Sequence, residues 1–260
     1  MEDQPELITT LTRGLRHRLS VPEVITGDTK VPLKDLKNII ATYNLTRRAS
    51  PVVNGQNADR PIHIGNPGVV GLFSFGVVTI ILGIFRLFLP WKSQVILLPS
   101  ALLFGGLTQM IAGFFDLFVG GTFSATILIS YGAFWTGNGM MMAPSMNIVY
   151  NEYTNLEDRN QAHAIYCFMW AFYTLMLTGI SLAVKSGTFI LTWCLLFVFL
   201  ALTLEAIWYL DGTESIIRAS GVCAILAALG SFYSGCTAIF EEQGANFYVG
   251  HYPWVKDKSK

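Results

Sequence analysis

Hydrophobic residues gather in six long stretches between Gly68 and Phe240, and short polar segments separate them. The stretches are Gly68–Leu89, Ser93–Phe115, Thr122–Pro144, Ala164–Val184, Thr188–Leu210 and Ser215–Phe240. A helix that spans a bilayer needs about 20 mostly apolar residues, and each stretch supplies them. The pattern therefore predicts an all-α, polytopic membrane protein with six transmembrane helices.

Charge and composition agree with this prediction. The chain is 52% hydrophobic and 13% charged, which suits a membrane bundle better than a soluble domain. Arg86 and Glu205 lie well inside two of the stretches, each within about two turns of an end, where a long side chain can reach water. The net charge of zero gives no reason to expect a nucleic-acid partner.

The distribution of Lys and Arg predicts the orientation. With six spans, 13 of the 17 Lys and Arg residues fall on the side of the two termini, so both termini are expected in the cytoplasm, with the plasma membrane as the location. Residues 1–60 are polar and of mixed charge, which predicts a largely disordered tail. Residues 61–243 then form the six-span domain, and 244–260 a short second tail. The loop Met146–Gln161 is acidic and is expected to be a solvated connector.

No set of residues typical of catalysis occurs in the sequence. There is no H-E-x-x-H, G-x-S-x-G or phosphate-binding loop, and no two cysteines form a C-x-x-C pair. The four histidines are scattered, at His17, His63, His163 and His251. We therefore expect no enzyme activity, no cofactor and no metal site.

Small and neutral polar residues are frequent within the spans. Small residues share helix faces at Ala227, Ser231 and Gly235, and at Gly179 and Ala183, which lets helices approach closely or leaves room for a narrow conduit. The polar residues are neutral, among them Thr108, Gln109, Ser130, Tyr131, Ser231 and Tyr233. Such groups suit a small anion, a neutral acid or an amine, or they bond neighbouring helices, and they do not resemble a relay of buried carboxylates.

The first span opens with Gly65-Asn66-Pro67-Gly68. Asn is a strong helix N-cap and Pro fits the first helical turn. Within a membrane, the free N–H groups and the positive end of the helix dipole favour an anionic group. The alternative is a well-capped helix at the membrane surface.

Three segments carry a resemblance to a known family. Asn66–Leu72 is similar to the signature N-P-A-P-L-G-L, although Gly68 and Val69 replace its alanine and second proline. Phe104–Gln109 continues through Gly121-Thr122-Phe123 to Ser130–Trp135, and Glu241-Glu242-Gln243 follows the last span. Together these segments resemble the acetate uptake transporter family, in its fungal form with a long polar amino-terminal tail.

This resemblance implies six spans, a homohexamer in the lipid bilayer and a separate solute pathway in each subunit. It implies transport of acetate, succinate or other small carboxylates, linked to protons or channel-like. Ammonium export is an alternative, because some fungal relatives have been linked to it, and a non-transporting membrane sensor is another. The residues implied are Asn66, Pro67, Gly68, Thr108 and Gln109 for solute contact; Phe75, Tyr131 and Leu196, or Leu195 in its place, for the constriction; and Ser130, Ser231 and Tyr233 for the pathway lining.

An apolar constriction has a physical reason. A carboxylate loses its hydration at high cost when it crosses an apolar ring, whereas the protonated acid loses much less. An apolar constriction with polar groups on each side therefore favours small, weakly acidic solutes over hydrated inorganic ions.

Overall fold

The computed structural model describes residues 65–146 and 152–245, and these residues form helices joined by short turns. The predicted tail of residues 1–60 lies outside the described residues, as do residues 246–260 of the second tail. The helices are α3 (Pro67–Phe88), the π-helix η2 (Ser100–Thr108) continued by α4 (Gln109–Phe118), α5 (Thr122–Met142), α7 (Leu156–Ala183), α8 (Phe189–Asp211) and α9 (Glu214–Glu242). Two 3₁₀ turns, η1 (Val95–Leu97) and η3 (Pro144–Met146), flank η2 and α5. The all-α prediction is confirmed for the described residues.

Five of these helices are long and apolar enough to cross a membrane: α3, η2 with α4, α7, α8 and α9. The sixth candidate, α5, has 21 residues but carries more polar side chains. It has little outward surface, because its exposed residues are Thr122, Thr126, Ala133 and Met140. The structure thus supports an integral membrane protein and leaves the exact count of six spans as a prediction.

Two predicted boundaries are wrong. Helix α7 begins at Leu156, inside the segment expected to be a connector, because Asn155 caps it by accepting a bond of 3.1 Å from the backbone N–H of Glu157. Glu157 and Asp158 in its first turn suit the positive end of the helix. The second helical segment begins at Ser100 rather than Ser93, because Pro99 stands at its N-cap and suits a helix start.

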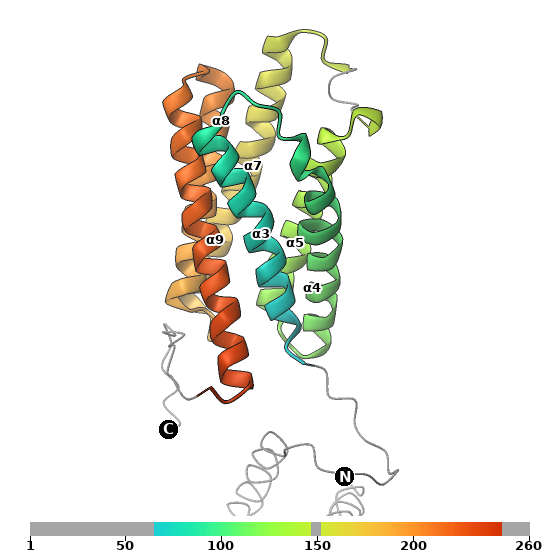
Figure 1. Ribbon diagram of the computed structural model, residues 1–260. Helices are drawn as coiled ribbons and strands as arrows, with labels where there is room; N and C mark the ends of the chain where they lie inside the picture. The colour runs from blue at the N-terminus through green and yellow to red at the C-terminus, as the bar shows by residue number, and fades with distance from the viewer. Residues whose placement is uncertain (1–64, 147–151, 246–260) are drawn as a thin grey trace, which may run out of the picture. The chain divides into compact units, whose positions relative to one another are not determined.

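Sequential helices pack as neighbours, as their short connections predict. Helices α7, α8 and α9 pack in sequence, and η2 with α4 packs on α5 (Figure 1). Helix α3 joins the two groups, since it contacts α9 on one side and η2, α4 and α5 on the other. The turn at Gly120, with φ of 90°, reverses the chain between α4 and α5, as the sequence predicts.

The contact between α3 and α9 is close enough for backbones to touch. A Cβ atom added to Gly83 would lie 2.8 Å from the carbonyl oxygen of Gly221, and one added to Gly221 would lie 2.7 Å from that of Gly83. Glycine is required at both positions because a backbone neighbour cannot move aside. Gly179 was expected to share such a packing face, but within this chain a Cβ there would meet nothing within 4 Å.

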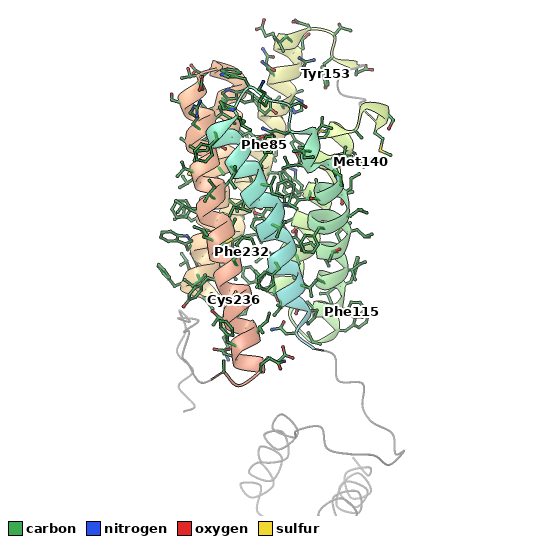
Figure 2. The ribbon with its side chains drawn as sticks, in the orientation of Figure 1. Phe85, Phe115, Met140, Tyr153, Phe232 and Cys236 are labelled. Carbon is green, nitrogen blue, oxygen red and sulfur yellow. The ribbon has the colours of Figure 1, made fainter. Side chains whose placement is uncertain are left out.

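The buried core lies where the two groups of helices meet. Its members come from α3, η2, α5, α7, α8 and α9, and they include Phe75, Tyr131, Trp135, Leu195 and Ala227. The side chains of Phe85 and Met140 lie toward the end of the bundle where α3 stops, and Phe115 and Cys236 toward the other (Figure 2). The core therefore lies in the interior of the bundle, between these two ends.

Candidate functional site

Aromatic side chains meet between α3, α5 and α7, at mid-length of α3. The Phe75 ring packs edge-on against the Tyr131 ring, with centroids 5.7 Å apart. Trp170 of α7 lies on the other side of Tyr131, at 6.3 Å between centroids. Phe75 is 7% exposed and Tyr131 only 2%. The structure thus brings together two of the three residues expected at the constriction.

The Tyr131 hydroxyl has a defined orientation. It lies 2.6 Å from Oγ1 of Thr174, and that threonine hydroxyl donates its hydrogen to the carbonyl oxygen of Trp170 at 2.7 Å. The Trp170 carbonyl can only accept, so we assign the single hydroxyl hydrogen of Thr174 to it and make Tyr131 the donor between the two hydroxyls. The Tyr131 oxygen therefore keeps a lone pair as its remaining capacity, so it can accept a hydrogen bond from a solute but cannot donate one.

The aromatic contacts continue along α5 and α7 toward the end where α3 stops. Phe134 packs edge-on against Trp170 at 4.9 Å and stacks on Tyr166 at 6.2 Å. Toward the other end, Ser130 lies within 2.9 Å of the Tyr173 hydroxyl and also bonds the carbonyl of Thr126. One wall of the candidate pathway is therefore aromatic, with hydroxyl groups below the constriction.

Of the two leucines considered for the third constriction residue, Leu195 lies with Phe75 and Tyr131 and Leu196 does not. Leu195 is 2% exposed and belongs to the same buried cluster as Phe75 and Tyr131. Leu196 is 41% exposed and lies outside that cluster. Adjacent helical residues point about 100° apart, so an error of one position in α8 moves the side chain from the core to the surface.

The two residues expected to line the pathway on α9 differ in their surroundings. Ser231 is fully buried, and its hydroxyl donates to the carbonyl of Leu72 at 2.8 Å, which joins α9 to α3. Tyr233 is half-buried and is not a member of the core cluster. The structure therefore gives Ser231 a helix-joining contact in place of a free hydroxyl.

The start of α3 has the predicted cap. Oδ1 of Asn66 accepts a bond of 3.1 Å from the N–H of Gly68, and Pro67 occupies the first turn. Asn66 is exposed, and a Cβ added to Gly65 would lie 3.8 Å from a carboxylate oxygen of Glu242. Since nine residues separate Asn66 from Phe75, this end lies about 14 Å from the constriction along the helix.

Thr108 and Gln109 stand where the π-helix changes into α4. The Thr108 hydroxyl donates to the carbonyl of Leu103 at 2.9 Å, five residues back. Gln109 is 1% exposed, and its buried Oε1 has no hydrogen-bond partner. A buried acceptor without a partner is costly, so Gln109 is the stronger candidate of the two for contact with a solute.

The chain matches the profile of the GPR1/FUN34/yaaH family over residues 52–254. It belongs to this family. It is 30% identical over 207 residues to ammonia transport outward protein 2 of Saccharomyces cerevisiae, which covers 76% of this chain and 69% of the relative. It is 28% identical over 205 residues to acetate permease A of Emericella nidulans, covering 73% and 67%. The solved structure of the bacterial acetate channel SatP superposes with a TM-score of 0.61 at 25% identity, over 72% of this chain and all of that one. The resemblance drawn from the motifs is confirmed.

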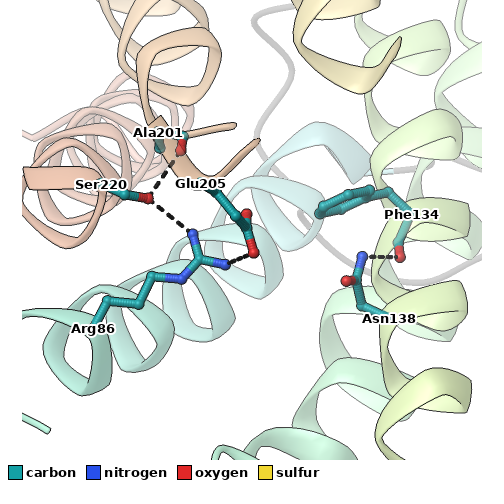
Figure 3. Close-up of polar contacts among 6 residues, drawn as sticks. All are labelled: Arg86, Phe134, Asn138, Ala201, Glu205 and Ser220. Carbon is teal, nitrogen blue, oxygen red and sulfur yellow. Dashed lines mark hydrogen bonds and ion pairs between the residues drawn. The ribbon is translucent and has the colours of Figure 1, made fainter. Parts of the chain in front are cut away.

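One buried polar group in this GPR1/FUN34/yaaH protein was missed by the sequence analysis. Arg86 and Glu205 were expected to reach toward water, but they form an ion pair inside the bundle, with side chains 6% and 12% exposed (Figure 3). The sequence did contain a signal for this pair. If the six expected spans alternate in direction, the first and the fifth run the same way, and they carry Arg86 and Glu205 near the same end. Arg86 also donates to Ser220 at 3.0 Å, which ties α3 to α9.

The described residues of this family member contain no candidate metal site. No group of three His, Cys, Asp or Glu side chains among residues 65–146 and 152–245 is placed to hold a metal ion. The buried carboxylate Asp116 bonds the hydroxyl of Ser124 at the turn between α4 and α5.

Proposed function

We propose that this protein is a membrane transporter or channel, not an enzyme, for acetate, succinate and other small carboxylic acids, which pass the constriction in protonated form. The observation that carries the proposal is the orientation of the Tyr131 hydroxyl, which is held as a hydrogen-bond acceptor by Thr174. A protonated acid has an O–H to donate to this oxygen, and a carboxylate has none. Transport would then be linked to protons.

The surroundings of Tyr131 support the same solute. Phe75 and Leu195 place apolar surface at the narrow point, which penalises a charged solute more than a neutral one. The unpartnered Oε1 of Gln109 adds a second buried acceptor for an acid O–H. The acetate-related names of two similar proteins, acetate permease A and the acetate channel SatP, agree with this solute class.

We assign the remaining parts as follows. Residues 61–243 form six spans, with α5 as the third, both tails in the cytoplasm and a homohexamer in the plasma membrane. A polar helix such as α5 can cross lipid because its polar side chains are bonded: those of Ser124, Thr126, Ser130, Tyr131, Thr136 and Asn138 each have a hydrogen-bond partner. Asn66, Pro67 and Gly68 would receive the solute at the tail side.

Ammonia or ammonium is the second candidate solute. Both have N–H groups that could donate to Tyr131, and a relative 30% identical is named for outward ammonia transport. A non-transporting sensor, with the tail as its working part, is the third reading. Deleting Met1–Arg60 separates it from the others, because a sensor has no flux to lose.

The test is flux into liposomes that contain the full chain, with labelled acetate, succinate and methylammonium, each with and without a pH gradient. We expect uptake of acetate to follow the concentration of the protonated acid. Thr174→Val leaves the Tyr131 proton without its acceptor and should reduce acetate flux, whereas Thr203→Val, which removes a hydroxyl bonded within its own helix at 2.8 Å, should not. Flux of methylammonium but of neither acid would overturn the carboxylate proposal.

A further inference from the structure

The Arg86–Glu205 ion pair lies on the same helix faces as the constriction. On α3 and on α8, four residues spaced three or four positions apart lie on one face of the helix. These are Phe75, Val78, Leu82 and Arg86 on α3, and Leu195, Val198, Leu202 and Glu205 on α8, and all six apolar members are buried in the core cluster. Arg86 follows Phe75 by eleven residues, so the pair lies about 16 Å further along the same line.

The bonding of this pair is incomplete. Nη1 of Arg86 donates to Oγ of Ser220 at 3.0 Å, and Nη2 donates to Oε1 of Glu205. Arg86 is 5% exposed, yet its Nε–H has no hydrogen-bond partner. A buried guanidinium usually has all of its donors used, so an unused one marks a place for a further acceptor.

Other polar groups surround the pair. From α7, His163, Tyr166 and Cys167 lie in electrostatic range of Glu205, and Arg159 acts on His163. His163 also stacks on Tyr209 of α8 at 4.8 Å, and α9 contributes the hydroxyl of Ser220, which donates to the carbonyl of Ala201 at 2.9 Å. Tyr166 stacks on Phe134, so the aromatic wall of the constriction reaches this pair.

We propose that Arg86 and Glu205 form a second solute site, at which the carboxylate of a small acid replaces Glu205 on Arg86 while Glu205 holds the acid's proton. This inference rests on the proposed function, since it needs a small carboxylic acid in the pathway. It adds a charged exchange site to an otherwise apolar route.

The exchange balances in atoms and charge. The O–H bond of the incoming acid breaks, an O–H bond forms on Glu205, and the acid's carboxylate takes the place of Glu205 beside the guanidinium. The buried site holds one cation and one anion before and after, so no uncompensated charge is created. Protonated Glu205 is neutral and costs far less to keep out of water than a lone carboxylate.

The site has a measurable consequence for binding. Glu205 is the anionic partner of Arg86 before the exchange and a neutral acid after it, so each acetate anion taken from solution must bring one proton. Linkage then requires the affinity to fall about tenfold for each unit rise in pH. A guanidinium that bound acetate without Glu205 would show no such dependence.

The experiment is calorimetric titration of acetate into the purified full chain in detergent, at several pH values above about 6 and in buffers with different ionisation enthalpies. We expect the wild type to take up one proton per acetate. Glu205→Gln should bind acetate with no proton uptake and no pH slope, and Arg86→Met should weaken binding at least tenfold. Glu214→Gln changes an exposed ion pair with Arg218 near the same end, and it should keep the wild-type slope.

Each outcome decides between the two proposals. A pH slope that survives Glu205→Gln, wild-type affinity in Arg86→Met, or absence of acetate binding to the wild type would overturn the exchange site, whatever the liposome assay gives. If Arg86→Met does not fold, the double variant Arg86→Gln with Glu205→Gln restores a neutral pair and is expected to lose the binding in the same way. Normal exchange in detergent with no acetate flux in liposomes would overturn the transport function and keep the site.

Discussion

Single residues give this pathway its chemical selectivity. Tyr131 is surrounded by rings of Phe75, Phe134 and Trp170, and its one hydrogen is committed to Thr174. A hydrogen-bond acceptor surrounded by apolar side chains favours the protonated form of an acid over its carboxylate. Neither the apolar side chains nor the hydroxyl would provide this discrimination alone. The proposed preference for a neutral acid therefore depends on a pair of hydroxyls, not on one tyrosine.

The first prediction compares adjacent leucines on α8. Leu195→Ala should raise acetate flux or admit larger acids such as succinate, because it removes buried surface beside Phe75 and Tyr131. Leu196→Ala should change neither, because that side chain is 41% exposed. The measurement is uptake of both acids beside the thermal stability of each variant.

The stability readout separates a gate from ordinary core packing. Truncating a packed core leucine to alanine costs about 2–5 kcal/mol, while a side chain that borders a solute space costs less. A large loss of stability in Leu195→Ala with unchanged acid preference in the surviving protein would count against the constriction. Altered selectivity in Leu196→Ala alone would move the pathway to the outer face of α8.

Sequence reasoning at this scale was strongest where motifs fixed the register. Phe75 and Tyr131 stand next to recognisable motifs and are in contact, whereas α8 carries no motif and Leu195, the second choice of its two leucines, is the one that joins their cluster. The Arg86–Glu205 pair was missed because its partners are 119 residues apart and no local pattern joins them. Pairings of this kind depend on which helices meet, which periodicity does not specify.

At the scale of helices, two caps of identical geometry allow a matched test. Asn66 and Asn155 each accept a bond of 3.1 Å from the N–H two residues on, at the starts of α3 and α7. Replacing either with alanine should cost about 1 kcal/mol of stability. We expect Asn66→Ala to reduce acetate uptake as well, and Asn155→Ala to leave it unchanged, measured as flux per folded protein. Equal uptake in the two variants would reduce Asn66 to a cap.

The glycines of the helix contacts give a second element-scale prediction. Gly221→Ala should destabilise the bundle by about 1–3 kcal/mol, because its Cβ would meet the backbone of Gly83 and Leu87 below 3 Å. Gly179→Ala on α7 meets nothing and should be neutral or slightly stabilising, since alanine favours a helix. Thermal unfolding in detergent measures both, and equal melting temperatures would contradict the close α3–α9 contact.

Helix existence was predictable from apolar stretches, but helix ends depended on local chemistry. Asn155, Glu157 and Asp158 start α7 before its apolar residues begin, so hydropathy alone placed the start too late. The π-helix η2 has no hydrophobic signal of its own, because bonding between residues five positions apart is a matter of backbone geometry.

For the whole molecule, α5 decides the topology. It is absent from the five helices that are apolar enough to cross, and most of its polar side chains bond within the bundle, although the buried Nε1 of Trp135 has no partner. Its crossing therefore depends on these hydrogen bonds more than on an apolar surface. If α5 crosses, six spans return both termini to one side. If it does not, five crossings place them on opposite sides.

The last prediction follows from this count. Both termini should be cytoplasmic, because 13 of the 17 Lys and Arg residues then lie on the cytoplasmic side. Protease added to intact cells should spare tags at either end and cut them after the membrane is opened, while a tag inserted after Lys92, in the connection between α3 and η1, should be cut in intact cells. Cleavage of both terminal tags in intact cells would reverse the orientation. Cleavage of one alone would show that α5 does not cross, and the acceptor side of Tyr131, which α5 carries, would then need a different route to water.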